Sequence, residues 1–388
     1  MKKFLFLFFV FCNISYAENI KNYINTNSSV SAKEVKQLYP FIYFDFKGEV
    51  FYDRLTLESE NPMNFFYTQS ELLINLNLNK FLTIHTNFGL EKIKGSFFTP
   101  SSFDRFEEKQ NAFEGTSLTA KELSVRFNFD RISIDVGKMS LNFAGGNERW
   151  SDDFYDIWYG IGGTFLNQGY ALEEKVGFKI NAVAIDQTDA KVTFEIGAFS
   201  NDNTVLFKKP FFVKREMEGF TIPEGGKRQA GSAKYLKSYA TSIKGFVGFI
   251  RRDVLSFNLG YRKQASEDGI LEQGASATAQ YTIIFFDDLA VSAFGEGVKI
   301  WNAYAIDGFD EQYITGSLAA GFAGLKFGIV KNDYQSKVRD FKNKIKFTEY
   351  FVGFEMPKTN FGIFLARKEY EGNSALSGFN MNVRYRIQ

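Results

Sequence analysis

The sequence predicts an all-β fold, a transmembrane antiparallel β-barrel of about 16 strands. Three observations support it: an export signal, apolar and polar residues that alternate along many segments, and long and short connections that follow one another in turn. Aromatic residues make up 18% of the chain. No segment beyond the export signal reaches the roughly 18 consecutive apolar residues of a membrane helix, so helical spans are excluded.

The first residues, MKKFLFLFFVFCNISYA, have the pattern of a secretory signal peptide. Lys2 and Lys3 precede a short apolar run, and the small residue Ala17 suits cleavage directly after it. We therefore expect a signal peptide at 1–17. Cys12 is the only cysteine, so the exported chain has no disulfide.

The exported chain is nearly neutral. Of 46 Lys and Arg residues, Lys2 and Lys3 leave with the signal peptide, so 44 bases face 45 acids. This balance argues against a nucleic-acid partner, which a strongly basic chain would suggest. Residues 18–39 are polar and lack alternation, which predicts a periplasmic lead-in, and residues 40–388 are expected to form the barrel.

Alternation with a period of two predicts the individual strands. In FIYFDFKGEVFY, Ile42, Phe44 and Phe46 alternate with Asp45 and Lys47. The same pattern recurs in SELLINLNLNK, in KELSVRFNFDRISIDVGK and in the final GFNMNVRYRIQ. A soluble β-sandwich alternates as well, so this pattern alone does not decide the fold.

The lengths of the connections favour a membrane barrel. Short turns are expected at 79–80, 130–131, 186–190, 251–253, 286–288, 323–324 and 357–359. Longer connections are expected near 53–64, 94–117, 140–169, 200–238, 264–274, 302–312, 332–345 and 370–377. Fifteen connections join 16 strands, with 14 or 18 strands as alternatives. Short periplasmic turns and long extracellular loops are typical of Gram-negative outer-membrane barrels.

The third long connection is unusually acidic and aromatic. Its sequence from position 145 is GGNERWSDDFYDIWYGIGG, and its charged residues are Glu148, Arg149, Asp152, Asp153 and Asp156. By this position and composition, the chain resembles the general bacterial porins. The resemblance implies a 16-stranded barrel and a homotrimer, with the third loop folded into the lumen as the constriction. The alternative is an external loop whose acids bridge divalent ions to lipopolysaccharide.

In the porins that the chain resembles, basic residues on the barrel wall face the acidic loop. On the inward faces predicted by alternation, the corresponding bases are Lys47, His85, Arg126 and Arg384. Glu71, Glu91 and Glu122 share this wall, which argues against a strong field across the lumen. We expect no metal and no cofactor.

The function that the resemblance implies is passive diffusion of small hydrophilic solutes and ions, with a weak preference for cations. Two alternatives are a substrate-selective channel for a sugar, carboxylate or phosphate, and a non-conducting structural or adhesive barrel. An enzyme is not expected, because His85 has no recognisable nucleophile motif beside it. The basic connection near 200–238 suggests contact with lipopolysaccharide phosphates, or a solvated loop.

Overall fold

The computed structural model describes residues 39–57, 63–92, 116–145, 170–201, 230–233, 236–248, 253–286, 289–339, 341–356, 361–371 and 376–387. The predicted signal peptide and nearly all of the predicted lead-in lie outside these ranges. The described residues form sixteen strands and one 3-10 turn, η3 (Ala303–Ala305).

The strands run from the first described barrel residues to the last. Their bounds are β1 Phe41–Leu57, β2 Met63–Asn79, β3 Leu82–Lys92, β4 Thr116–Phe129, β5 Ile132–Leu141, β6 Leu172–Asp186, β7 Ala190–Asn201, β8 Ser238–Gly248, β9 Val254–Ala265, β10 Leu271–Phe286, β11 Leu289–Trp301, β12 Phe309–Phe322, β13 Leu325–Val338, β14 Phe341–Met356, β15 Phe361–Glu371 and β16 Leu376–Ile387.

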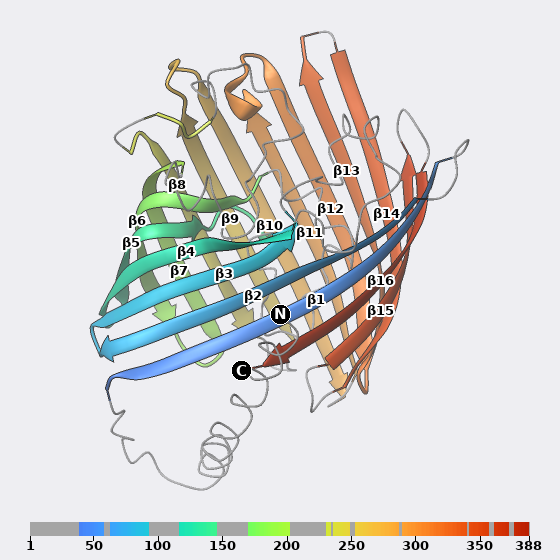
Figure 1. Ribbon diagram of the computed structural model, residues 1–388, viewed down its shortest axis with the longest axis horizontal. Coiled ribbons are helices and arrows are strands. Elements are labelled where there is room, and N and C mark those ends of the chain that lie inside the picture. The colour runs from blue at the N-terminus through green and yellow to red at the C-terminus, as the bar shows by residue number, and fades with distance from the viewer. Residues whose placement is uncertain are drawn as a thin grey trace, which may run out of the picture. The chain divides into compact units, whose positions relative to one another are not determined.

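Every strand pairs with its neighbours in the sequence, and β1 pairs antiparallel with β16, which closes the sheet. Figure 1 shows the strands side by side in chain order, with β16 returning to lie along β1. Closure satisfies the backbone N–H and C=O groups that lipid cannot satisfy. The predicted fold class and the count of 16 strands are thus confirmed.

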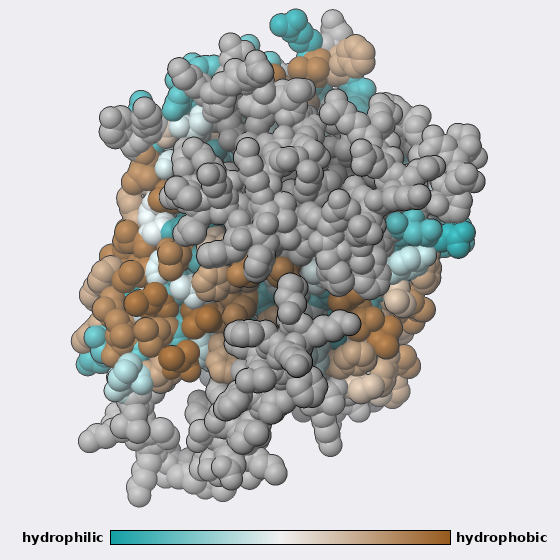
Figure 2. Space-filling view, in the orientation of Figure 1, coloured by the Kyte–Doolittle hydropathy of each residue, from teal (hydrophilic) through white to brown (hydrophobic). Residues whose placement is uncertain are grey.

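The two faces of the sheet have opposite chemistry. Large apolar side chains such as Ile42, Leu259 and Phe327 are exposed on the outer face, and brown side chains cover the barrel exterior where it is visible in Figure 2. Asp45, Glu296 and many other polar side chains are buried on the inner face. This pattern, apolar outside and polar inside, suits a sheet surrounded by lipid. Within the described ranges, no helix is long and apolar enough to cross a bilayer.

Ion pairs join the first and last strands across the closure. Arg386 on β16 donates two hydrogen bonds to Asp45 on β1, at 3.1 and 2.6 Å. Further along β1, Lys368 of β15 and Asn380 of β16 both donate to Asp53 at 2.7 Å. These contacts hold strands that lie more than 300 positions apart in the sequence.

Two-residue turns close several hairpins at the end of the barrel expected to face the periplasm. Ala323 and Gly324 connect β12 to β13, and both have positive φ, at 48° and 86°. Positive φ at both central residues matches the twist of the paired strands. The predicted turn at 323–324 therefore forms as expected.

The prediction of eight long connections is wrong in part. Connections 93–115, 142–171 and 202–237 are long, but 332–345 is mostly strand, because β13 extends to Val338 and β14 begins at Phe341. The connections at 58–62 and 372–375 are also shorter than predicted. In this hairpin the outward residues are charged or amide, as at Asp333, Gln335 and Lys344, while Tyr334 and Ile345 pack inward. The apolar-outward pattern is therefore lost while backbone pairing continues.

Candidate functional site

Three of the four predicted wall bases lie together on the inner face. Lys47, His85 and Arg126 line one cavity of about 370 Å³. Residues from β1 to β6 contribute to its lining, which comprises Asp45, Lys47, Glu71, Leu73, His85, Asn87, Lys121, Glu122, Arg126, Ser140 and Glu173. The cavity is strongly polar and carries both signs of charge, so it suits solutes that need hydrogen bonds.

A β-bulge adds one charge to this cavity. Asn87 of β3 pairs with Glu122 of β4, and the next residue, Phe88, pairs with Ala120, so Lys121 is unpaired in the ladder. Bulges redirect side chains in this way. The consecutive residues Lys121 and Glu122 both line the cavity, and Lys121 donates to Glu71 at 2.7 Å.

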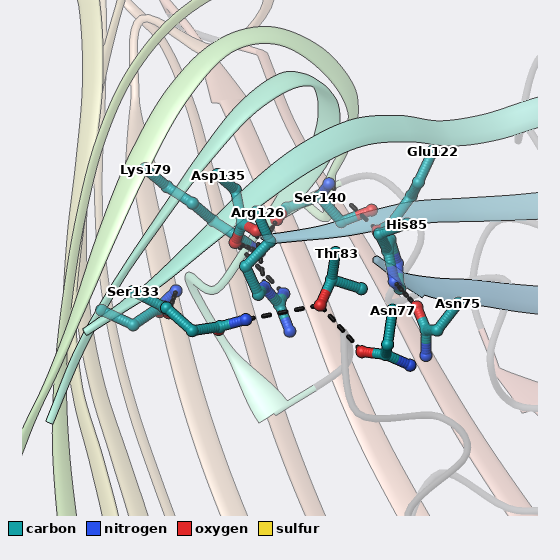
Figure 3. A network of polar contacts seen from close by, with 12 residues as sticks. Asn75, Asn77, Thr83, His85, Glu122, Arg126, Ser133, Asp135, Ser140 and Lys179 are labelled. Carbon is teal, nitrogen blue, oxygen red and sulfur yellow. Dashed lines mark hydrogen bonds and ion pairs between the residues drawn. The ribbon is translucent and has the colours of Figure 1, made fainter. Parts of the chain in front are cut away.

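His85 is held by oxygen atoms on both ring nitrogens. Its Nδ1 lies 2.6 Å from Oδ1 of Asn75, and its Nε2 lies 2.6 Å from Oε2 of Glu122. The other carboxylate oxygen of Glu122 accepts a hydrogen bond from the backbone N–H of Ser140 at 3.1 Å. Figure 3 shows this chain of contacts from β2 through β5.

Arg126 is oriented by a buried carboxylate. Its Nε and one Nη donate to the two oxygens of Asp135, at 2.6 and 3.2 Å. The Asp135 side chain is 1% exposed, whereas the Arg126 side chain is 35% exposed, so part of the guanidinium reaches the lumen. Lys179 approaches the same carboxylate at 3.8 Å and donates to the carbonyl of Ser140 at 2.9 Å, as Figure 3 shows.

Arg384 lies away from these residues, on β16. Its guanidinium donates to Glu355 at 2.8 Å and lies over the ring of Phe364, 4.3 Å from the centroid. Lys326 shares Glu355 at 2.5 Å. Arg384 is not among the described residues that line the cavity.

The wall charges are largely compensated. Arg126 and Arg384 each pair with a carboxylate, and His85 contacts Glu122. Lys47 lies directly opposite Glu71 on one side and Arg386 on the other. Paired charges produce a weaker field than isolated bases, so this wall is less basic than the porin resemblance implies.

The five predicted constriction residues, Glu148, Arg149, Asp152, Asp153 and Asp156, lie outside the described residues. The two ends of their connection are described, and both meet one carboxylate on β11. The backbone N–H of Gly145 donates to Glu296 at 2.8 Å, and the Tyr170 hydroxyl donates to the other oxygen of Glu296. Glu296 faces inward, five strands around the barrel from β6.

Other inward side chains hold the same two ends. Glu195 accepts from the Asn142 N–H at 2.6 Å, and Asn258 donates to the Asn142 side chain at 3.1 Å. Arg262 donates to the Tyr170 carbonyl at 2.5 Å and pairs with Glu272 at 2.8 Å. We call Glu195, Arg262 and Glu296 the loop anchor.

Apolar contacts complete the loop anchor region. Phe143 and Tyr170 are fully buried in a cluster with Ile300 and Tyr313, and the Tyr170 and Tyr313 rings meet edge to face at 5.0 Å. A Cβ on Gly260 would overlap the carbonyl oxygen of Phe143, so only glycine fits there. Both ends of the connection are therefore packed against the inner wall.

Sequence reasoning did not find the loop anchor. Glu296 lies 151 positions from Gly145, and no local pattern links the two. The available signal was that the charged residues at 195, 262 and 296 occupy inward positions of their strands. Among the described residues, no group of three or more His, Cys, Asp or Glu side chains is placed to hold a metal ion.

Neither a protein-family model nor a curated protein matches the sequence. Solved structures do match the fold. The trimer form of OmpT, an outer membrane protein of Vibrio cholerae, has a TM-score of 0.50 and 10% identity, covering 89% of this chain and 99% of its own. The anion-selective porin from Comamonas acidovorans has a TM-score of 0.52 and 10% identity, covering 89% and 99%.

A third solved structure, the outer membrane channel DcaP of Acinetobacter baumannii, has a TM-score of 0.51 and 9% identity, covering 90% of this chain and 100% of its own. At such identities the likeness establishes the fold. The chain is an outer-membrane barrel of a Gram-negative bacterium. Its closed sheet and apolar exterior agree with that location.

Proposed function

We propose that this barrel is a channel through which small hydrophilic solutes and ions diffuse passively across the outer membrane. The observation that carries the proposal is the double contact of Glu296 with Gly145 and Tyr170. Both described ends of this connection are therefore held at one inward carboxylate, which supports our proposal that the segment between them, 146–169, narrows the lumen.

Barrel size supports a channel. A sheet of 16 strands is too wide for its own side chains to fill, so it leaves an aqueous path. The inner face supplies charged and amide groups on many strands, among them Asp45 and Asp53 on β1 and Asn258 on β9. Passive diffusion requires only such a water-filled path through the barrel.

We assign the ion preference to the third connection. Glu148, Asp152, Asp153 and Asp156 outnumber Arg149, which gives the segment three net negative charges. Fixed carboxylates in a narrow, low-dielectric opening attract cations. Since the wall bases are compensated, these acids decide the sign. The porin from Comamonas acidovorans is anion-selective with the same fold, so the fold itself does not set selectivity.

An enzymatic role finds little support in the geometry. The ring nitrogens of His85 contact the side chains of Asn75 and Glu122, so in the described residues neither nitrogen meets the hydroxyl of a serine or threonine. A substrate-selective channel is the second candidate, favoured by the mixed-charge cavity beside Arg126. We also propose a homotrimer, as the porin resemblance implies.

Swelling of proteoliposomes tests the proposal. The purified, folded chain should let uncharged sugars enter, and the swelling rate should fall steadily from pentoses to trisaccharides. Liposomes with heat-denatured protein provide the control. Uniform rates below a sharp size limit support general diffusion, whereas fast entry of one sugar alone supports the substrate-selective candidate. Folded protein that causes no swelling would contradict a channel.

A further inference from the structure

We propose that the outer face of β13, β14 and β15 binds the phosphate groups of an outer-leaflet lipid of the lipid A type. The surface, called here the basic belt, consists of Lys331, Lys337, Lys342, Lys344, Lys346 and Arg367. The proposal rests on the fold and its outer-membrane location, and it does not depend on the proposed channel function. It concerns residues outside the basic connection near 200–238.

The register of the strands places the basic belt at the upper edge of the apolar exterior. A row is a set of residues that lie directly across from one another on β13, β14 and, where it is paired, β15. In order from the periplasmic turns, the outward rows are Leu325–Phe354–Ile363, Phe327–Val352–Leu365, Ile329–Tyr350–Arg367, Lys331–Thr348–Glu369, Asp333–Lys346–Glu371, Gln335–Lys344 and Lys337–Lys342. The first rows are apolar and exposed. The first charged residue is Arg367, in the third row. The charged rows continue from there toward the end of the barrel that carries the long connections, which is the extracellular side.

Two lysines of the belt face each other. Lys337 and Lys342 are direct cross-strand partners beside the 339–340 turn, and both are exposed. Directly opposed residues have Cβ atoms about 4.5–5.5 Å apart, and like charges there are destabilising. Such a pair becomes favourable when an anion lies between the two ammonium groups.

The belt also has more bases than acids. Three of its bases have partners: Lys344 pairs with Asp333 at 2.9 Å, Lys346 with Glu371 at 3.5 Å and Arg367 with Glu369 at 2.9 Å. Within the described residues, Lys331, Lys337 and Lys342 form no ion pair, and Asp310, which lies across from Lys337 on β12, pairs with Lys299 instead. Three lysines thus remain to receive an external anion.

The residues next to the basic belt favour a lipid ligand over a free anion. Exposed apolar side chains, among them Phe327 and Val352, continue from the belt toward the periplasmic side and suit acyl chains. Lys331 lies in one cross-strand row with Gly316 and Gly295. A Cβ on Gly295 would meet no atom within 4 Å, so the surface in this row is open and carries no side chain at the two glycines. A ligand with both phosphates and acyl chains fits these features together.

Native mass spectrometry of the detergent-purified, folded chain tests the proposal. Bisphosphorylated lipid A is titrated against wild type and against K331Q/K337Q/K342Q. Each lysine near an anionic lipid surface contributes measurably, so we expect the triple variant to bind at least tenfold more weakly. The control K80Q/R131Q/K191Q removes three exposed bases at the short-turn end and should bind as wild type does.

Equal binding by wild type and the triple variant would overturn the proposal, as would an equal loss in the control. Two further ligands separate the possible sources of the anion. Dephosphorylated lipid A should bind at least tenfold more weakly than the bisphosphorylated form. Inorganic phosphate should not displace lipid A, and full displacement by it would contradict a lipid site.

K342E provides a test that does not depend on loss of binding alone. The new carboxylate can pair with Lys337, its direct cross-strand partner, so this variant should melt at a higher temperature than wild type in lipid-free detergent. Lipid A should raise the melting temperature of wild type and have little effect on K342E. If lipid A stabilises both equally, or if K342E melts below wild type without lipid, the opposed lysines are not the phosphate site.

Discussion

At the scale of single residues, buried charges hold the barrel closed. Lys368 is fully buried, and it donates to Asp53, which is 1% exposed and also accepts from Asn380. Removing one partner of a buried ion pair leaves the other charge uncompensated, at a cost of about 3–5 kcal/mol. Because the pair joins β15 to β1 across β16, this cost makes it a strong determinant of the closure between β1 and β16.

We predict that Lys368→Met lowers the free energy of unfolding by about 3–5 kcal/mol. Lys346→Met is the matched control, because Lys346 is 54% exposed in its pair with Glu371. An exposed pair contributes about 0–1 kcal/mol. Guanidinium unfolding in detergent micelles measures both. Equal effects would show that burial at the closure is unimportant.

A second residue-scale prediction concerns the compensated wall. Asp135→Asn removes the carboxylate shared by Arg126 and Lys179, so the lumen gains one net positive charge. We expect the zero-current potential to shift toward anion preference. Glu369→Gln makes the same chemical change on the outer face and should leave the potential unaltered. No shift in Asp135→Asn would mean that ions do not pass this wall.

At the scale of elements, the loop anchor is the contact that a sequence cannot reveal. Arg262 lies 92 positions from Tyr170, and Glu296 lies 126 positions from it. Such pairs meet only because the closed sheet brings their strands around the lumen. Strands, in contrast, can be predicted from the sequence, since successive side chains along a strand point to opposite faces of the sheet.

We predict that Glu296→Ala loosens the third connection. The Tyr170 hydroxyl loses this acceptor, and a buried unsatisfied group costs about 1–3 kcal/mol, while the Gly145 N–H keeps only its longer hydrogen bond to Thr278 at 3.3 Å. A protease that cuts after Glu should then cleave at Glu148 faster than in wild type, and single-channel currents should become noisier. Glu371→Ala, on the exposed rim, serves as the control. Unchanged cleavage and noise would contradict the anchoring role.

The hairpin of β13 and β14 shows why strand ends were mispredicted. In NDYQSKVRDFKNKI the outward residues are polar, whereas Tyr334 and Ile345 pack inward, so the segment lacks the lipid-facing pattern by which the other strands were predicted. In the structure it is paired up to the 339–340 turn, and its outward residues form the basic belt. An apolar residue at every second position indicates a strand whose outer face contacts lipid. This pattern therefore does not predict the part of a strand that extends beyond the lipid.

At the scale of the whole molecule, sequence patterns were sufficient for the closed barrel, the number of strands and the membrane location. They were sufficient because lipid places the same requirement on every strand: its outward side chains must be apolar and its backbone groups must all be hydrogen-bonded. The compensation of Arg126 by Asp135 and of Arg384 by Glu355 was not predictable, because charge pairing depends on register between strands.

The proposed homotrimer is a prediction about the assembled molecule. Light scattering of the purified protein in detergent, corrected for bound detergent, should give three times the mass of one chain. A single-chain mass under mild detergents that preserve other trimers would contradict it. The channel proposal does not depend on this result, because each barrel encloses its own lumen.

The most direct test of the account is single-channel recording in planar bilayers, with conductance and zero-current potential measured for wild type and for Asp152→Asn/Asp153→Asn/Asp156→Asn. We predict that wild type conducts with a cation preference and that the triple variant shifts toward anions, because we propose that the carboxylates of the third connection line the narrowest part of the path. A conducting wild type with an unchanged triple variant would place those carboxylates outside the path. Folded protein that does not conduct would contradict the channel itself.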